Sequence, residues 1–268
     1  MVSSVQFMRK TDVIIGTRLF PMDDFEMSFE IGFDDDTEPN TGHVKIINLS
    51  ESTISQISKG SQIIVNAGYA GDVGSIFVGS IDKVKSEWSG VDKISQFDVG
   101  DATDRWINTY VNKSYKSGIT ASQIVKDVLG SFGIEIGVVA LAEDKVYPGG
   151  KIVTGQLQSV LKSIVVNDCK SKFHIINGVI MISAPAAGTQ TGFLLNADTG
   201  LIDSPMKVDD EKEKVDYKVK CLLNHRLTTD SLIQIQSKTA NGNFRVVRGK
   251  HIGSNSGDFI TETEVKAI

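Results

Sequence analysis

The chain has 268 residues, of which 40% are hydrophobic and 23% charged, with a formal net charge of −5 and a pI near 5.4. This is the composition of a globular protein, and it argues against disorder. The acidic balance and the scattered basic residues do not favour binding to nucleic-acid phosphates or to a membrane surface. No stretch approaches the roughly 18 apolar residues of a membrane span, and residues 1–10 lack the pattern of a signal peptide.

Alternating apolar residues mark the first strong strand, predicted at residues 25–33, because a half-buried strand repeats every two residues. A polar, turn-forming stretch follows, and a second strand completes a hairpin over residues 25–49 with a charged tip. Further strands are predicted at 62–69, 75–84 and 93–99, with a short helix at 50–59 that Ser50 caps and Gly60 ends. Residues 1–100 are therefore expected to form a small antiparallel β-barrel or sandwich.

Helix signals distinguish the middle of the chain. Thr120 and Gln123 have the spacing of a capping box, and apolar residues with helical spacing follow them. A second helix is expected from about Thr154, with an apolar stripe at positions 157, 160, 161, 164 and 165. Asn177-Gly178 between two apolar runs is typical of a tight hairpin. Residues 101–190 are therefore predicted to be an inserted α+β domain that ends in a small-residue linker at 184–188.

The last third returns to strand patterns. Strands are predicted at 217–223, 232–238, 243–249 and 260–267, and the charged run 209–214 suits an exposed loop or hairpin tip. The predicted fold class is mainly β with an α+β insertion. Two β domains, residues 1–100 and 191–268, would be separated by a small helix-containing domain, residues 101–190; the resemblance described below implies that both are tube-type antiparallel β-barrels.

No catalytic, cofactor-binding or metal-binding residues are predicted. The four histidines, His43, His174, His225 and His251, lack HxH and HExxH spacing and fall in different predicted elements. The two cysteines, Cys169 and Cys221, lie far apart without a CxxC or histidine neighbour, so neither a disulfide nor a metal site is expected, and a reducing compartment is favoured.

Three other patterns have a functional and a simpler interpretation. The acidic run 34–36 could attract calcium, but it lacks the spacing of an EF-hand loop and suits a solvated hairpin tip better. The glycine-rich stretch 67–74 is not followed by the GK[ST] of a phosphate loop. Glu87 and Asp92 flank Trp88 as a glycosidase pair might flank an aromatic platform, although a single Trp between two strands is more typical of a hairpin.

Several motifs, in this order along the chain, resemble those of phage baseplate hub proteins. They are Glu38-Pro39-Asn40, Val44-Lys45-Ile46-Ile47-Asn48-Leu49-Ser50, Lys59-Gly60, Asn66-Ala67-Gly68-Tyr69, Gly74-Ser75-Ile76-Phe77-Val78-Gly79-Ser80-Ile81, Lys113-Ser114-Tyr115, Gly118-Ile119-Thr120-Ala121-Ser122-Gln123-Ile124-Val125, Thr199-Gly200-Leu201-Ile202-Asp203-Ser204-Pro205, Cys221-Leu222-Leu223-Asn224 and Phe244-Arg245-Val246-Val247-Arg248-Gly249-Lys250-His251. The family includes the hubs of contractile tails and R-type bacteriocins, and is similar to the first half of type VI secretion spike proteins.

The resemblance implies a homotrimer in which two tube-type barrels per subunit give six similar units around a channel. The implied partners are the tail tube, central spike, tape measure and other baseplate proteins, with DNA only in transit through the lumen. It also implies a structural virion protein of the tail baseplate, made in the host bacterial cytoplasm, that is not an enzyme and has no cofactor. Because the sequence stops at Ile268 without an appended lysozyme, peptidase or long β-helix, wall cutting is expected to belong to another protein.

The polar positions of the strand at 25–33, namely Glu26, Ser28, Glu30 and Gly32, are small or acidic. If they face the lumen, they would repel DNA phosphates and let DNA slide; a register slip of one residue would exchange the two faces. Three alternatives stay open: the N-terminal hub region of a flexible-tail tip protein, a tail-associated cell-wall hydrolase, and a carbohydrate-binding β module.

Overall fold

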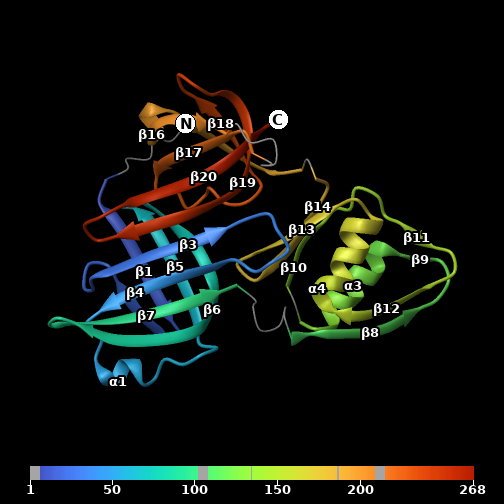
Figure 1. Cartoon of the computed structure of the whole chain (residues 1–268), viewed down its shortest axis with the longest axis horizontal. Coiled ribbons are helices and arrows are strands. Elements are labelled where there is room, and N and C mark those ends of the chain that lie inside the picture. The colour runs from blue at the N-terminus through green and yellow to red at the C-terminus, as the bar shows by residue number, and fades with distance from the viewer. Residues whose placement is uncertain (1–6, 102–107, 134, 186, 209–214) are drawn as a thin grey trace. The chain divides into compact units, whose positions relative to one another are not determined.

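A computed structural model describes residues 7–101, 108–133, 135–185, 187–208 and 215–268 (Figure 1). Its contacts divide the chain into two compact units. Unit 1 comprises Met1–Asp34, Asn40–Gly100 and Gly188–Ile268, and unit 2 comprises Asp35–Pro39 and Asp101–Ala187. The predicted fold class, mainly β with an α+β insertion, is confirmed. In the described residues, no helix is long and apolar enough to cross a membrane.

Unit 1 is built on a sheet with 13 strands in the described part of the chain. The segment before the insertion supplies β1 (Arg9–Ile15), β2 (Arg18–Pro21), β3 (Met27–Phe33), β4 (Thr41–Ile47), β5 (Gln62–Tyr69), β6 (Asp72–Ser89) and β7 (Asp92–Gly100). The segment after it supplies β15 (Thr189–Leu195), β16 (Leu201–Lys207), β17 (Tyr217–Leu222), β18 (Ser231–Gln236), β19 (Asn241–Ser254) and β20 (Phe259–Ala267). The order is β16-β17-β20-β19-β3-β4-β7-β6-β5-β1-β2, with β18 paired to β19 and, in parallel, to β15.

Strand β3 confirms the alternation predicted for residues 25–33. Met27, Phe29, Ile31 and Phe33 are all buried. The strand begins two residues later than predicted, because the backbone N–H of Phe25 donates to the carbonyl of Pro21 in a turn. The Phe25 ring nevertheless packs against the core, where it makes an edge contact with Phe20 at 5.4 Å between ring centres.

Pairing between β3 and β19 joins the two β segments into one sheet, and Figure 1 shows the two strands side by side. Strands β3 and β19 approach each other closely at two glycines of β19. A Cβ on Gly253 would lie 2.2 Å from the ring of Phe29, and one on Gly249 would lie 2.6 Å from the ring of Phe33. The segments also share a core, since Phe259 makes edge contacts with Phe29 and Tyr69. That they are two separate barrel domains stays a prediction.

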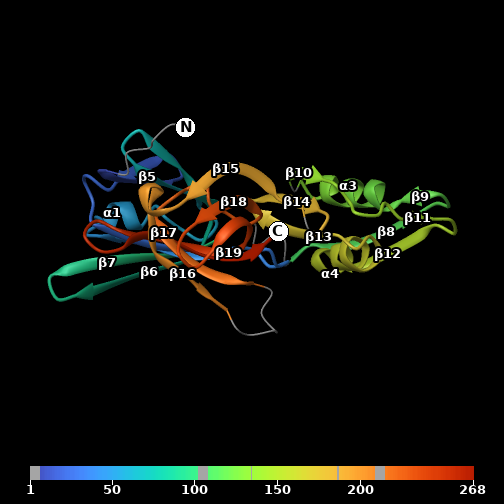
Figure 2. The same cartoon turned by 90° about the horizontal axis from the view of Figure 1, so that it is seen from above.

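Strand β6 is longer than the predicted strand at 75–84. It pairs with β5 up to Ser80, bends at a register shift between Ile81 and Lys83, and continues with β7 to Ser89. The end of this hairpin extends past its neighbours, as Figure 2 shows. Gly90, with φ of +65°, makes the turn.

The predicted helix at 50–59 is only one turn long, α1 (Glu51–Ile54). Ser50 caps it as predicted, by accepting a hydrogen bond from the N–H of Thr53. The helix cannot continue because the next residues form a turn: the N–H of Ser58 donates to the Ser61 hydroxyl, and the N–H of Gly60 donates to the carbonyl of Ile81 in β6.

In its described residues, unit 2 combines short strands with the helical elements α3, α4 and η1 around one core. Its elements are β8 (Tyr110–Tyr115), β9 (Ile119–Thr120), α3 (Ala121–Ser131), β10 (Glu135–Val139), β11 (Val146–Tyr147), β12 (Lys151–Gln156), α4 (Leu157–Leu161), the π-helix η1 (Lys162–Asp168), β13 (Lys172–Ile176) and β14 (Val179–Ser183). The Asn-Gly hairpin is confirmed, because Asn177 and Gly178 both have positive φ between β13 and β14. The charged run predicted as a loop at 209–214 lies outside the described residues.

The second helix begins at Leu157, not near Thr154 as predicted. Residues 151–156 form β12 instead, paired with β8, because Val153 and Thr154 are β-branched and Gly155, with a φ of +140°, does not favour a helix. The apolar stripe was predicted correctly, and its five residues are buried. It continues from α4 through η1.

The capping box of α3 is confirmed, and it allows a direct test. Thr120 Oγ1 accepts from the N–H of Gln123, and Gln123 Oε1 accepts from the N–H of Thr120. Replacing Thr120 with Ala should lower the free energy of unfolding by about 1 kcal/mol, because one helical N–H loses its acceptor. Urea unfolding measures this, and Thr120→Ser is the control that should retain the stability. Equal losses in both variants would contradict the capping role.

Candidate functional site

Seven strands of unit 1, β17, β20, β19, β3, β4, β7 and β6, present alternate side chains away from the core. We call this surface the polar face. Its side chains are Ser28, Glu30, His43, Lys45, Lys83, Lys85, Gln96, Asp98, Lys218, Lys220, Arg248, Lys250, Glu262 and Glu264. It exists because charged and apolar residues alternate along each strand.

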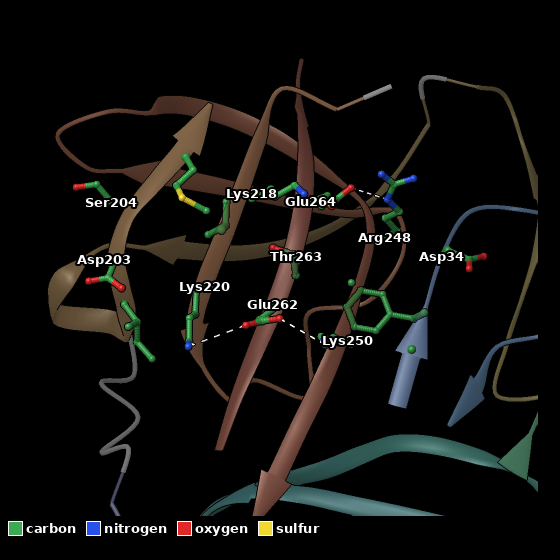
Figure 3. Close-up of a pocket in the computed structure, with 16 residues that line it drawn as sticks. Asp34, Asp203, Ser204, Lys218, Lys220, Arg248, Lys250, Glu262, Thr263 and Glu264 are labelled. Atoms are coloured by element: carbon green, nitrogen blue, oxygen red, sulfur yellow. Dashed lines mark hydrogen bonds and ion pairs between the residues drawn. The ribbon is translucent and has the colours of Figure 1, made fainter. Parts of the chain in front are cut away.

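Carboxylates of β20 each lie between basic residues of the two neighbouring strands. Glu262 is 4.0 Å from Lys220 Nζ on β17 and 3.8 Å from Lys250 Nζ on β19 (Figure 3). Glu264 contacts Lys218 Nζ at 3.4 Å and also pairs with Arg248. Cross-strand pairs of opposite charge stabilise a sheet. Here each acid is bracketed by two bases.

The same arrangement recurs on the other half of the polar face. Asp98 accepts hydrogen bonds from Gln96, from Lys85 Nζ at 3.1 Å and from His43 Nδ1 at 2.8 Å. Partial burial acts to raise the pKa of Asp98, but these hydrogen bonds outweigh it and hold the pKa at about 2. At the centre of the face, Lys250 Nζ reaches Glu30 at 3.1 Å, and this hydrogen bond raises the pKa of Lys250.

A pocket of about 490 Å³ lies on the polar face among β16, β17, β20, β19 and β3. Figure 3 shows its charged lining, in which Glu262 lies between Lys220 and Lys250. The lining pairs acids with bases. In the part of the chain that the structure describes, no three His, Cys, Asp or Glu residues come together as metal ligands. The arrangement is suited to charge recognition.

Two further charge clusters lie within unit 2. Asp168 accepts from Lys145 Nζ at 2.7 Å, from Lys151 Nζ at 3.0 Å and from the Tyr147 hydroxyl at 2.8 Å. Although burial acts to raise it, these contacts hold the pKa of Asp168 at about 2. Asp127 on α3 likewise accepts from Lys113 and Tyr115 on β8. Both clusters attach strands to helices, and we therefore assign them a structural role.

The residues considered as a glycosidase pair lie at the end of the β6–β7 hairpin. Trp88 is exposed, with Lys93 Nζ 5.9 Å from its ring centre. Asp92 accepts a hydrogen bond from Asn48 Nδ2 at 2.9 Å. The hairpin interpretation is therefore confirmed.

The acidic run 34–36 lies in the loop between β3 and β4, as predicted, and Asp36 is exposed. Residues 35–39 belong to unit 2, where Gln158 Nε2 donates to Thr37 and to Glu38 Oε1. Asp36 Oδ1 accepts from the backbone N–H of Glu38 in a local turn. The sequence could not indicate this, because Gln158 lies about 120 residues further along the chain.

The histidines occupy different surroundings. His43 lies on the polar face, His174 is buried on β13, and His225 and His251 lie in unit 1. Burial lowers the pKa of His251 to about 3, and His225 lowers it further by charge repulsion. His251 Nδ1 lies 2.9 Å from the Thr261 hydroxyl inside the sheet. Both cysteines are free and buried, in different units, and burial raises the pKa of Cys221 to about 12.

The sequence did not lead us to predict that basic residues gather on the polar face. Lys218, Lys220, Arg248 and Lys250 sit at alternate positions of their strands, as do Glu262 and Glu264. This alternation of charged residues within each strand was the sequence signal that could have identified the polar face. The expected acidic surface of β3 is altered as a result, because Glu30 is paired with Lys250, while Glu26 precedes the strand.

No protein-family model matches the sequence, and no curated protein matches it. Solved structures do match. A 43 kDa tail protein of prophage MuSo2 from Shewanella oneidensis is 10% identical, with a TM-score of 0.70 and 97% of each chain covered. A tail protein from Neisseria meningitidis is 11% identical, with a TM-score of 0.65 and 97% of each chain covered.

A type VI secretion component from E. coli, described as structurally similar to the T4 tail proteins gp27 and gp5, is 10% identical with a TM-score of 0.68. The match covers 96% of this chain and 76% of the E. coli chain. Because the identities are this low, the likeness concerns the fold. The chain therefore has the fold shared by phage tail proteins and this type VI secretion component, which is the structural class that its sequence motifs predicted.

Proposed function

We propose that the chain is a structural baseplate hub protein of a phage or phage-like tail. It would form a ring that joins the sixfold tail tube to the trimeric central spike and leaves a channel for DNA. The observation that carries this proposal is the fold likeness to two phage tail proteins over 97% of each chain. The ordered sequence motifs resemble those of baseplate hub proteins, which supports the proposal independently of the fold.

The architecture of unit 1 supports a wall-forming role. A sheet with one apolar and one polar face can pack on one side and border water on the other. Each subunit contributes two β segments, before and after the insertion, that share a single sheet. Three subunits would then supply six such segments around one axis, matching a sixfold tube on one side and a trimeric spike on the other.

The proposed partners are a second and third copy of the chain, the tail tube, central spike and tape measure proteins, and other baseplate proteins. The proposed location is the virion tail, and the proposed role is not enzymatic. The fold likeness to phage tail proteins supports this. We expect the purified protein to leave peptidoglycan in a gel undigested; a cleared band would favour the hydrolase alternative.

Sedimentation of the purified protein, alone and mixed with the spike protein encoded with it, tests the ring. The expected result is a species of three subunits, at least in the presence of the spike, that electron microscopy shows as a ring. A monomer under both conditions, at concentrations where the spike itself is trimeric, would overturn the proposal.

A further inference from the structure

The end of the β6–β7 hairpin carries exposed apolar side chains. Trp88 is 68% exposed and Val91 is 89% exposed. Beyond Ile81, β6 pairs with β7 alone among the described residues, and the hairpin extends past its neighbours in the sheet (Figure 2). We call residues 83–93 the arm. A two-stranded ribbon by itself is only marginally stable in water, and Trp is enriched among the hot spots of protein–protein interfaces. The arm therefore has the features of a docking element.

The β7 side of the arm is attached to the end of β4, and the Trp88 ring is held in place. Asn48 Nδ2 donates to Asp92 Oδ1 at 2.9 Å, and the N–H of Lys93 donates to Asn48 Oδ1 at 2.9 Å. Lys93 Nζ lies 5.9 Å from the centre of the Trp88 ring and also pairs with Glu51 of α1. Side chains that are ordered before binding lose less entropy when a partner covers them. The arm is therefore prepared for a partner.

The two sides of the arm differ. Val84, Ser86 and Trp88 alternate along β6 and therefore share one side, and Val84 packs against the core of unit 1. Trp88 thus lies on the apolar side of the sheet, past the end of the core. Lys85 and Glu87 alternate with these residues and lie on the side of the polar face. Whatever covers Trp88 must approach from the apolar side of the arm.

At the opposite boundary of the polar face, β16 presents apolar side chains on the polar side. Met206 is 66% exposed and pairs with Lys218 across the strands, and Ile202 pairs with Lys220, so both share the side of these lysines. Both line the pocket of about 490 Å³, and Figure 3 shows Lys218 and Lys220 on β17. A Met side chain makes favourable contacts with aromatic rings, and a Lys ammonium attracts the face of an indole. The pocket therefore suits an aromatic side chain.

Backbone pairing cannot readily join these two boundaries. Pro205 and a register shift interrupt β16, and Lys83 and Lys85 belong to the open strand of the arm. Prolines, bulges and lysines are features that protect edge strands from pairing. The edge at the other end of the sheet, β2, is only four residues long, and Arg18 attaches it to Thr53 of α1. A contact at the arm must therefore be made by side chains.

We propose that the arm of one copy of the chain overlaps the margin of the polar face of the next copy, with Trp88 in the pocket beside Met206. The inference rests on the proposed hub function, because a ring of identical subunits joins two different surfaces of each subunit. The arm and β16 lie at opposite boundaries of the polar face, as such a ring requires. The sides agree as well. When all polar faces point toward the ring axis, an arm that lies over its neighbour's polar face turns its apolar side, and hence Trp88, toward Met206.

Sedimentation velocity of the full chain over a range of concentrations, with the spike protein present, tests the contact. Trp88→Ser with Val91→Ser should raise the concentration at which half of the chains are assembled by about 30-fold, because a Trp hot spot is lost. Met206→Ser should raise it by about tenfold. Adding Met206→Ser to the arm variant should raise it by less than the product of the two factors, because the effects of residues in contact are not independent.

The matched control is Tyr110→Ser with Ile152→Ser. It removes an aromatic and an aliphatic side chain that are 62% and 75% exposed in unit 2, and it should leave assembly unchanged within about twofold. Thermal unfolding of every variant verifies that it is folded. A control variant that weakens assembly as much as the arm variant would overturn the inference, because the effect would then follow lost surface hydrophobicity in general.

Cross-linking tests which surfaces meet. Ser86→Cys places a thiol on the Trp88 side of the arm, and Ser204→Cys places one on β16 at the pocket. The natural Cys169 and Cys221 are buried. A flexible bifunctional maleimide should link the two single variants when they are mixed and neither variant to itself, because the proposed interface joins unlike surfaces. Linkage of the Ser86→Cys variant to itself, or no linkage in the mixture, would contradict the proposed contact.

The same samples separate this inference from the proposed function. Rings of three that form normally in the Trp88 and Met206 variants would reject the contact and leave the hub proposal standing. Rings that form normally but lose the spike protein when Trp88 is replaced would assign the arm to the spike and also reject the contact. Linkage of the arm to β16 in open chains that never close into rings would support the contact and reject the hub.

Discussion

Between pH 6.5 and pH 4, the free energy of unfolding should fall by about 3 kcal/mol through His251 alone. The imidazole is fully enclosed within the sheet, and its burial lowers the pKa from 6.5 to about 3. In this pH range the unfolded chain binds a proton at His251 and the folded chain does not. The stability is therefore complete above pH 6.5, declines as the pH falls, and is lost near pH 3.

Urea unfolding at several pH values between 6.5 and 4 measures this loss, and His251→Gln should remove most of it. Burial also lowers the pKa of His225, so a smaller slope should persist without His251. The pKa of Asp98 and of Asp168 is lowered from 3.8 to about 2, so most of the stability that these carboxyls contribute is lost below pH 4. A wild-type slope in His251→Gln would contradict the assignment.

Replacement of Asp230 by Asn should lower the free energy of unfolding by about 3 kcal/mol, because it leaves the Arg245 guanidinium buried without its carboxylate. Arg245 Nη1 lies 2.7 Å from Asp230 Oδ1, and the side chains are only 10% and 8% exposed. The carbonyl of Asp230 also accepts from the N–H of Thr189, where the chain returns to unit 1. Asn is chosen because Asp230 has a φ of +65°, which Asn tolerates better than Ala.

A second substitution separates lost charge from lost packing. Arg245→Met combined with Asp230→Asn removes both charges of this ion pair, and it should recover at least half of the lost stability because the guanidinium is removed together with the carboxylate that it contacts. Thermal or urea unfolding of the two variants measures the difference. A double variant less stable than Asp230→Asn would show that the aliphatic packing of Arg245, and not its charge, governs this site.

Local sequence patterns predicted much of the fold because their causes are local. The alternation in β3, the capping box of Thr120 and Gln123, and the Asn177-Gly178 turn each depend on residues a few positions apart. The errors arose where a distant contact decided the outcome. The helix after Ser50 stops after one turn because Gly60 bonds to Ile81. A distant residue, Gln158, also supplies the contact that places residues 35–39 in unit 2.

The sequence by itself determined that the chain is mainly β, that a helix-containing segment interrupts it, and that its motifs resemble those of baseplate hubs. Periodicity and caps are short-range, so they can be read along a single strand or helix. Only the tertiary structure decided the charge of the polar face. Glu30 looks acidic in its own strand, but pairing with β19 brings Lys250, 220 residues away, to its carboxylate. A strand therefore determines which of its side chains share a face, whereas its neighbours in the sheet determine the charge that the face presents.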